Sequence, residues 1–469
     1  MVGKKETIHP SSDVPGSSTD SHDDATLAAL GNVETRDATH PIHWSRWKKW
    51  SIIAVYCALQ TFIAMTTTTF VAAEFLVKEK YGGSTQVVAL GQSMFIVGTA
   101  IGPAFLGPLS DIGGRKWVYV ASIAIYAILN IGTAMALNLP MLIIFQFLAG
   151  AAGSTGLSNV AGTIADLFGD LDGAGQPMAL FVMTANYGPS IGSPIGEVIA
   201  SNPNLGLPWI FWINVIIGGC FSLIMCFIPE TLPRIVIAKA LKKHELTLPP
   251  AEVAIVEEKV DVLREMRFIT SMAFRIMLTE PIVVFLGIYN GFAYGLLFLY
   301  LDGVFDVFVV NNGLSELNAD LTYLNFVVAV TLMFCFVPAR FLTSLVGVWG
   351  FPVSLLWFAF TCDGNTSYWS PVIAGGVLGF FDPLLWLSML NYIADSYTNV
   401  AASAIAAFLI PSFALAAGCC HIGIIMFANL GAKWAMAILG FVSFGLVALV
   451  YVLYFFGAKI RGMSKLAKK

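Results

Sequence analysis

The feature that most constrains this chain is a series of long apolar segments, most of which contain no charged residue. Twelve such windows fall at 51–73, 87–109, 117–137, 139–165, 177–200, 208–229, 281–301, 321–338, 345–361, 371–393, 400–427 and 433–457. A helix of about 20 apolar residues crosses the apolar core of a bilayer, and the two short windows, 321–338 and 345–361, need flanking residues to do so. Because lipid offers no hydrogen-bond partner to an open backbone, each window is predicted to be a transmembrane helix.

The composition excludes most other classes of protein. Of the 469 residues, 57% are apolar and 12% are charged, whereas about 25% of the residues in a typical soluble domain are charged. These proportions exclude a soluble enzyme, a coiled coil, a collagen and a disordered chain. The net charge of −4 is too small to suggest nucleic acid as a partner. None of the seven cysteines has the spacing of a metal ligand, so no metal site is expected.

The longest interruption between windows, residues 230–280, divides them into six plus six. Its middle, residues 251–272, mixes charged and apolar residues at helix-like spacing, which predicts an amphipathic helix on the cytosolic surface. The predicted organisation is a disordered cytosolic tail at 1–45, a six-helix bundle at 46–229, this linker, a second six-helix bundle at 281–457 and a basic cytosolic tail at 458–469. The expected fold class is therefore all-α integral membrane, with 12 transmembrane helices in two bundles, as in transporters built from two related halves.

The basic residues predict the orientation of the chain in the membrane. With the N-terminus in the cytosol, 22 of the 25 Lys and Arg residues lie on the cytosolic side, and only Lys78, Lys80 and Lys433 lie outside. Cytosolic loops carry an excess of basic residues, so both termini are predicted to be cytosolic, and the expected location is the plasma membrane. The sequon Asn365-Thr366-Ser367 then lies outside, which makes Asn365 a candidate glycosylation site.

A loop rich in glycine and charge follows the second window. It reads Gly107-Pro108-Leu109-Ser110-Asp111-Ile112-Gly113-Gly114-Arg115-Lys116. Glycines allow a tight turn, and Asp111 can pair with helix N-terminal amides or with Arg115. Alternatively, Arg115 and Lys116 serve only to keep this loop on the cytosolic side of the membrane. The spacing resembles the G-x-L-S/A-D-x-x-G-R-K signature of the major facilitator superfamily. By that resemblance the loop latches the two bundles together, and Gly107, Asp111, Gly114, Arg115 and Lys116 form a conformational switch.

The fifth window contains a second motif, with Gly188, Pro189, Gly192, Pro194 and Gly196 within ten residues. Glycine and proline at this density bend a helix and let a neighbour pack closely. The segment also resembles the signature of drug:proton antiporters, in which Ser193 and Glu197 of this chain are replaced by glycine. The resemblance implies export in exchange for protons.

Further segments narrow the resemblance to the fungal branch of twelve-span drug:proton antiporters, which export caffeine-like compounds, polyamines and toxins. They are Pro229-Glu230-Thr231, Glu280-Pro281-Ile282, residues 391–397 and residues 457–461, and the likeness extends from about residue 45 to the end. Relatives carry an arginine in the fourth span where this chain has Gln146, and another near Ile410. By that resemblance, the chain lacks cations that relatives use in coupling or structure.

Several polar residues remain inside the predicted membrane region and are candidate proton or substrate sites. Asp382 is the twelfth residue of the 23-residue window 371–393, and an ionised acid at mid-bilayer costs several kcal/mol unless it faces a cavity or a partner. It is therefore either functional or a buried structural hydrogen-bonding group, and the same two alternatives hold for His421. The remaining candidates are Glu197 and Asp302 near the outer ends, where hydration is expected, Gln146, and the group Tyr289, Asn290 and Tyr294, which suits either core packing or a cavity wall.

These observations favour a secondary transporter that exports a small amphiphilic compound by alternating access, with protons as the coupling ion. The expected partners are a small-molecule substrate, protons and the lipid bilayer, and the expected state is a monomer without a cofactor. No Gly-x-x-x-x-Gly-Lys-Ser/Thr loop is present, which argues against ATP as the energy source. Import of a small nutrient or organic acid is the alternative. A membrane enzyme and a receptor are two further classes; an enzyme would need a nucleophile or a pair of His and acid at the water interface.

Overall fold

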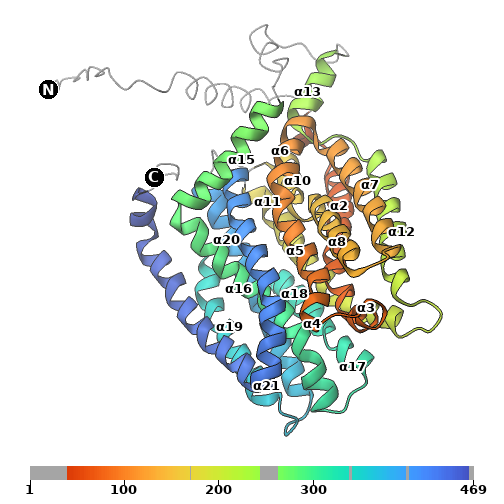
Figure 1. Cartoon of the computed structure of the whole chain (residues 1–469). Helices are drawn as coiled ribbons and strands as arrows, with labels where there is room; N and C mark the ends of the chain where they lie inside the picture. Colours follow the sequence, from red (N-terminus) through yellow and green to blue (C-terminus); the bar gives the residue numbers. More distant parts are fainter. Residues whose placement is uncertain (1–39, 170, 243–261, 337–340, 398–400, 464–469) are drawn as a thin grey trace, which may run out of the picture. The chain divides into compact units, whose positions relative to one another are not determined.

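The computed structural model describes residues 40–169, 171–242, 262–336, 341–397 and 401–463, and within these ranges all regular secondary structure is helical (Figure 1). The described residues fall into two units. The smaller unit comprises 40–44 and 233–242 and holds the short helix η1 (Pro41–His43) and α13 (Pro233–Lys242). The larger unit contains the remaining helices and is called the membrane domain below.

The membrane domain contains all the predicted transmembrane windows, and the described residues of each are mostly helical. Its first half consists of α2 (Arg46–Thr69), η2 (Val71–Ala73), α3 (Glu74–Tyr81), α4 (Thr85–Val88), α5 (Leu90–Ile101), α6 (Pro103–Gly113), α7 (Arg115–Ala134), α8 (Leu139–Gly153), α9 (Thr155–Ser158), α10 (Val160–Phe168), α11 (Leu171–Ala200) and α12 (Leu207–Phe227). Its second half consists of α15 (Val262–Thr279), α16 (Pro281–Val304), the π-helix η3 (Phe305–Val310), α17 (Glu316–Leu321), α18 (Leu324–Phe336), α19 (Phe341–Thr361), α20 (Trp369–Ser396) and α21 (Ala401–Met463).

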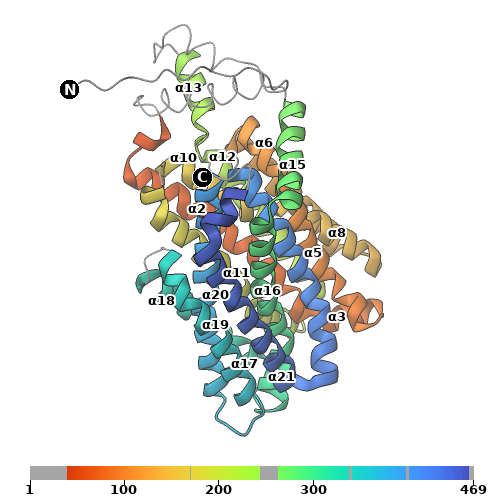
Figure 2. The ribbon, with the colours of Figure 1, turned by 90° about the vertical axis from the view of Figure 1, so that its left-hand side faces the viewer.

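Nine helical runs among the described residues are long and apolar enough to cross a membrane. One of them, Ser403–Phe456, holds two predicted windows, because the backbone leaves helical geometry at Gly431 (φ 70°). The two arms of α21 run in opposite directions from this turn (Figures 1 and 2). The helix α11 is not among the nine, and of α19 only Gly347–Thr361 forms an apolar run. The total of twelve spans therefore stays a prediction.

Glycines at every fourth position allow one close helix contact in each half of the membrane domain. In the first half, a Cβ added at Gly188, Gly192 or Gly196 of α11 would lie within 3 Å of atoms of α2, including backbone oxygens. In the second half, a Cβ at Gly287 or Gly291 of α16 would come within 3 Å of the backbone of α21. Helices in lipid associate through such close packing, because the hydrophobic effect does not distinguish lipid from protein. The regularly spaced glycines therefore allow one helix pair in each half to pack tightly.

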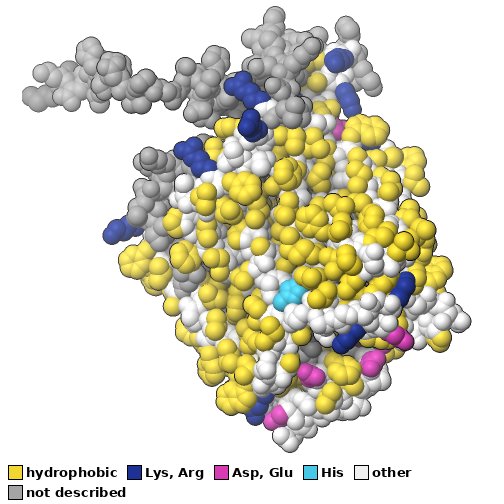
Figure 3. All heavy atoms as spheres, viewed as in Figure 1, with side chains coloured by type: hydrophobic (Ala, Val, Ile, Leu, Met, Phe, Trp, Pro, Cys, Tyr) yellow, Lys and Arg dark blue, Asp and Glu magenta, His cyan; other side chains and the backbone are white. Residues whose placement is uncertain are grey.

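The surface of the membrane domain is largely apolar. Large hydrophobic side chains are exposed on many helices, among them Trp117, Ile128, Leu223, Phe227 and Leu278. Figure 3 shows hydrophobic side chains over most of one face, with charged side chains near its upper and lower edges. A surface of this kind is stable in contact with lipid and unfavourable in water.

Candidate functional site

The loop predicted to be a switch folds into a buried ion-pair site between α6 and α7. Gly114 joins the two helices with φ 103°, a backbone conformation that side chains disfavour. The side chain of Arg115 is buried and forms ion pairs with Asp111 and with Asp166 of α10, the latter at 2.9 Å between Nε and Oδ2. The structure thus brings Asp111 and Arg115 together, with a second carboxylate that the motif does not include.

Neutral groups complete the surroundings of the Arg115 guanidinium. Its Nη1 donates a hydrogen bond to Ser110 Oγ at 2.9 Å, and the Asn159 side-chain amide donates to the same oxygen at 3.0 Å. A Cβ on Gly162 would lie only 2.7 Å from Arg115 Nη2. The guanidinium is therefore enclosed on several sides, and glycine at position 162 leaves room for it.

The carboxylate of Glu230 caps the N-terminus of α7. Its Oε1 accepts backbone hydrogen bonds from Arg115 at 2.9 Å and from Thr231 and Leu232 at 3.0 Å, and its Oε2 accepts one from Lys116 at 3.3 Å. A negative charge at a helix N-terminus satisfies unpaired amides and interacts favourably with the helix dipole. Of the two partners expected for Asp111, the structure provides Arg115, while Glu230 binds the helix amides. The Lys116 ammonium lies outside this cluster, 5.7 Å from the centre of the Trp117 ring.

The motif on α11 serves the contact with α2. Besides the glycine packing, Thr68 Oγ1 donates a hydrogen bond to the carbonyl of Pro189 at 2.9 Å. Pro189 and Pro194 both lie inside the helix, which continues to Ala200. The close approach expected from the sequence is therefore present. The packing explains the glycines of the motif without reference to a direction of transport.

A group of polar side chains surrounds the middle of α20. Asp382 lies midway along this helix of 28 residues, and its side chain is half-buried. It has no hydrogen bond or ion pair to any residue that the structure describes, and its charge acts on the hydroxyls of Tyr289 and Tyr294 of α16. Asn290 is buried beside Tyr289 on the same helix. A carboxyl group thus faces α16 without a fixed partner.

Four buried polar atoms near the middle of four different helices lack hydrogen-bond partners among the described residues. They are Gln60 Nε2 of α2, Gln146 Oε1 of α8, Tyr289 Oη of α16 and Trp386 Nε1 of α20. Leaving such a group unpaired costs about 1–3 kcal/mol, and each case in a native protein needs an explanation, such as a ligand or water. Gln60 Nε2 and Trp386 Nε1 are donors, Gln146 Oε1 is an acceptor, and Tyr289 Oη can act as either.

The helix α11 connects part of this polar group across the two halves of the domain. Thr184 donates a hydrogen bond to Gln60 Oε1 at 3.0 Å. One turn earlier, the ring of Phe181 contacts that of Trp386, with 6.0 Å between centroids. Trp386 itself follows Asp382 by one helical turn. We refer to Gln60, Gln146, Tyr289, Asp382 and Trp386 as the central polar group.

His421 lies in a hydrogen-bonded contact between the halves. Its Nε2 is 2.9 Å from Ser93 Oγ, and its Nδ1 is 2.8 Å from Gln86 Oε1. The amide nitrogen of Gln86 also donates to the backbone carbonyl of His421 at 3.2 Å. Of the two alternatives for His421, the structure places it in a satisfied contact that joins α21 to α4 and α5.

Two further hydrogen bonds join α11 to the second half. The hydroxyl oxygens of Tyr187 and Thr331 are 2.5 Å apart, and Ser193 Oγ donates to Asp320 Oδ2 at 3.0 Å. Glu197, one turn after Ser193, is 8% exposed and interacts electrostatically with Asp320 and Glu316. The expectation that Glu197 is simply hydrated was therefore wrong, because the neighbouring helices cover it. We call the His421, Thr331 and Asp320 contacts the outer clasp.

The remaining sequence candidates are Gly107, Asp302 and Asn365, and the carbonyl of Gly107 accepts a hydrogen bond at 2.8 Å from Ser110 Oγ of the Arg115 site. Gly107 belongs to α6, and Asp302 belongs to α16, where its side chain is outside the described residues. Asn365 is exposed in the loop between α19 and α20. Hydrogen bonds from Asn365, together with Lys433 at 3.4 Å, hold the pKa of Asp363 below its usual range. The amphipathic helix predicted for 251–272 falls partly outside the described residues, and α15 covers its end.

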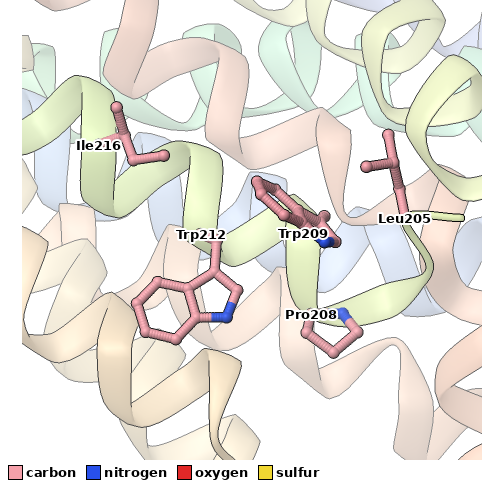
Figure 4. Close-up of a pocket in the computed structure, with 5 residues that line it drawn as sticks. All are labelled: Leu205, Pro208, Trp209, Trp212 and Ile216. Atoms are coloured by element: carbon pink, nitrogen blue, oxygen red, sulfur yellow. The ribbon is translucent and has the colours of Figure 1, made fainter.

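A pocket on the surface of α12 is a poor candidate for a substrate site. It is lined by Leu205, Pro208, Trp209, Trp212 and Ile216, it is open, and it contains no titratable group (Figure 4). Tryptophans at the end of a span are typical of the boundary between lipid and water. The pocket therefore fits the lipid boundary better than it fits specific recognition.

Sequence reasoning missed several residues of these sites. Asp166, Asn159, Gln86 and Trp386 were not singled out, and Glu230 was noted only as part of a family motif. One signal was available: Asp166 directly follows the apolar window 139–165, and an acid at that border needs a partner. The other contacts join positions far apart in the chain and leave no local pattern.

Comparison with known proteins establishes the family. The sequence profile of the Major Facilitator Superfamily matches residues 55–346. The chain belongs to the Major Facilitator Superfamily. It is 47% identical over 460 residues to an uncharacterized transporter of Schizosaccharomyces pombe, covering 94% of this chain and 84% of the relative. Its relatives are named transporters, so this superfamily member is a multi-pass membrane transporter and not an enzyme.

Other relatives and solved structures show how wide the family is. A vitamin B6 transporter of S. pombe is 39% identical, covering 93% of this chain and 86% of the relative. An ascochitine biosynthesis cluster transporter of Didymella fabae is 27% identical, covering 95% and 90%. The proton:xylose symporter XylE shares the fold, with a TM-score of 0.66 at 14% identity, covering 88% of this chain and 96% of XylE.

Proposed function

We propose that this superfamily member is a proton-coupled secondary transporter that moves small ring compounds by alternating access. The observation that carries the proposal is Asp382: it is a carboxyl group midway along α20 with no fixed partner among the described residues. A membrane-embedded acid that is not held by a counter-ion can bind and release a proton or a cationic group. The adjacent unpaired donors and acceptor supply contacts for a substrate.

The charges of the predicted spans favour a neutral or cationic substrate. Across the twelve windows the only Lys or Arg is Lys433, at the first position of the last window. An organic acid would therefore find no buried Lys or Arg to pair with, which disfavours the import of organic acids. The rings of Tyr289, Tyr294 and Trp386 suit an aromatic or heteroaromatic compound. One relative is named a vitamin B6 transporter, and vitamin B6 is a pyridine compound, which agrees with a ring-shaped substrate.

Export of an amphiphilic drug, toxin, secondary metabolite or polyamine is the first candidate for the direction. The biosynthesis-cluster relatives support it, together with the overall resemblance to twelve-span drug:proton antiporters. Uptake of a small nutrient is the second candidate, and the vitamin B6 transporter, at 39% identity over nearly the whole chain, favours it.

The proposed arrangement in the membrane comprises twelve spans in two six-helix bundles, 46–229 and 281–457, with both termini in the cytosol of a plasma-membrane monomer. The distribution of basic residues supports this orientation. In this frame the outer clasp closes the outer side, because its three contacts join the first half to the second. The Arg115 cluster draws its members from residues 110–230 alone, so it shapes the cytosolic end of the first half.

Transport in proteoliposomes tests the proposal. The purified chain is reconstituted, a pH gradient is imposed, and radiolabelled pyridoxine and a cationic amphiphilic drug are followed in separate experiments. We expect at least one compound to accumulate against its gradient, and a protonophore to abolish that accumulation. The side on which the compound accumulates, relative to the acidic side, distinguishes antiport from symport. Accumulation that survives the protonophore would contradict proton coupling.

A further inference from the structure

The helix α15 has one exposed face on which arginines alternate with large apolar side chains. Exposed positions recur at every third or fourth residue, which places them on a single side of the helix. Phe268, Phe274 and Leu278 are 52%, 45% and 81% exposed. With the exposed arginines they form what we call the arginine face: Arg264, Arg267, Phe268, Phe274, Arg275 and Leu278. No acidic side chain is described on it.

The opposite face holds α15 against the membrane domain. Ala273 and Ile276 are buried, and Thr270 Oγ1 donates a hydrogen bond to the carbonyl of Ala104 in α6 at 2.9 Å. Ser403 of α21 donates to the carbonyl of Ile269 at 3.4 Å. The rotation of α15 about its axis is thereby fixed, so the arginine face points away from the helices it packs on.

The position of α15 along the chain places it at the border of the membrane. Only Glu280 separates it from the span α16, and Glu280 is buried, with Tyr397 Oη donating to its carboxylate at 2.9 Å. Leu278, the most exposed apolar residue of the helix, lies two positions before this junction. Figures 1 and 3 show α15 at the edge of the domain, in a region where basic and hydrophobic side chains are interspersed.

We propose that the arginine face binds anionic phospholipids of the cytosolic leaflet. Guanidinium groups match phosphate geometry with paired hydrogen bonds, and the cytosolic leaflet carries the negative surface potential that attracts basic segments. The interspersed Phe and Leu side chains fit the boundary between headgroups and acyl chains; a soluble polyanion would make no use of them. The proposal rests on the cytosolic placement of the linker and is independent of the transported compound.

Lipid binding to the purified full-length chain tests this proposal. In neutral detergent, phosphatidylserine is titrated and the thermal unfolding midpoint is followed to obtain a half-saturating concentration. Each basic residue near an anionic surface strengthens binding about fivefold. The double variant Arg267→Gln/Arg275→Gln is therefore expected to raise the half-saturating concentration about 25-fold. Phosphatidylcholine is expected to have no comparable effect.

Two control variants separate lipid recognition from general charge effects. Lys78→Gln/Lys80→Gln removes the same charge from exposed positions on α3 and should leave the titration unchanged. Arg267→Lys/Arg275→Lys keeps the charge and loses the paired hydrogen bonds, so it should bind more weakly than the parent and more tightly than the Arg→Gln variant. Equal stabilisation by phosphatidylcholine, or an unchanged titration in the Arg→Gln variant, would overturn the proposal. An equal effect of soluble inositol hexaphosphate would also overturn it, because the apolar part of the face would then have no role.

Discussion

Removal of the Glu230 carboxylate should destabilise the end of the first half where α6 meets α7 more than a typical surface substitution does. In Glu230→Ala, the backbone amides of Arg115, Thr231 and Leu232 lose a buried acceptor. An unsatisfied buried donor costs about 1–3 kcal/mol, and the interaction with the helix dipole adds about 0.3–2 kcal/mol. Because water can reach part of a membrane border, we expect a total loss of about 3–5 kcal/mol in the free energy of unfolding.

A graded series of variants makes this prediction specific. Glu230→Gln keeps one acceptor oxygen and removes the charge, so it should cost about 1–2 kcal/mol. Glu79→Ala is the matched control, because this acid is exposed on α3 and has no contact with the α7 terminus. Unfolding is followed by denaturant titration in detergent, with the expected order of stability Glu79→Ala, then Glu230→Gln, then Glu230→Ala. If Glu230→Ala proves as stable as Glu79→Ala, the capping argument is refuted.

Three other predictions concern transport and topology. Asp111→Ala and Arg115→Ala are each expected to insert normally and transport more slowly, which a transport assay normalised to surface protein would test; normal rates in both would remove the switch role. In the Gln86→Cys background, His421→Ala still breaks the contact with Ser93 of the outer clasp, so the cysteine should be labelled faster from outside than in Gln86→Cys alone. Equal labelling would show that His421 does not hold the clasp. A C-terminal tag should resist protease added to intact cells, and cleavage would reverse the predicted orientation.

The sequence predicts the spans well because the physics behind them is local. A window of apolar residues has only the helix available in lipid, and the described residues of each window are mostly helical. The threonines at 66–69 each donate a hydrogen bond to a carbonyl of their own helix, a local contact that threonine hydroxyls commonly form. The spacing of Gly188, Gly192 and Gly196 indicated a close helix contact but could not name α2 as the neighbour.

The partners of polar side chains could not be predicted in the same way. The pairs Arg115–Asp166 and Arg115–Glu230 are separated by 51 and 115 residues, and Ser93–His421 by 328. No periodicity connects such positions; the packing of whole helices brings them together. Glu197 shows a different error. Its place near the end of a window suggested that its side chain contacts water, whereas neighbouring helices cover it. The sequence located the polar residues, and tertiary packing determined which of them are paired.

The central claim is that Asp382 carries the coupling proton, and Asp382→Asn tests it most directly. The substitution keeps the size and hydrogen-bonding capacity of the side chain and removes its ability to ionise. In proteoliposomes with an imposed pH gradient, we expect the variant to lose uphill accumulation and to retain exchange of the substrate down its own gradient. Loss of exchange as well would assign Asp382 to substrate binding. Uphill accumulation in Asp382→Asn with the pH dependence of the parent would contradict the account.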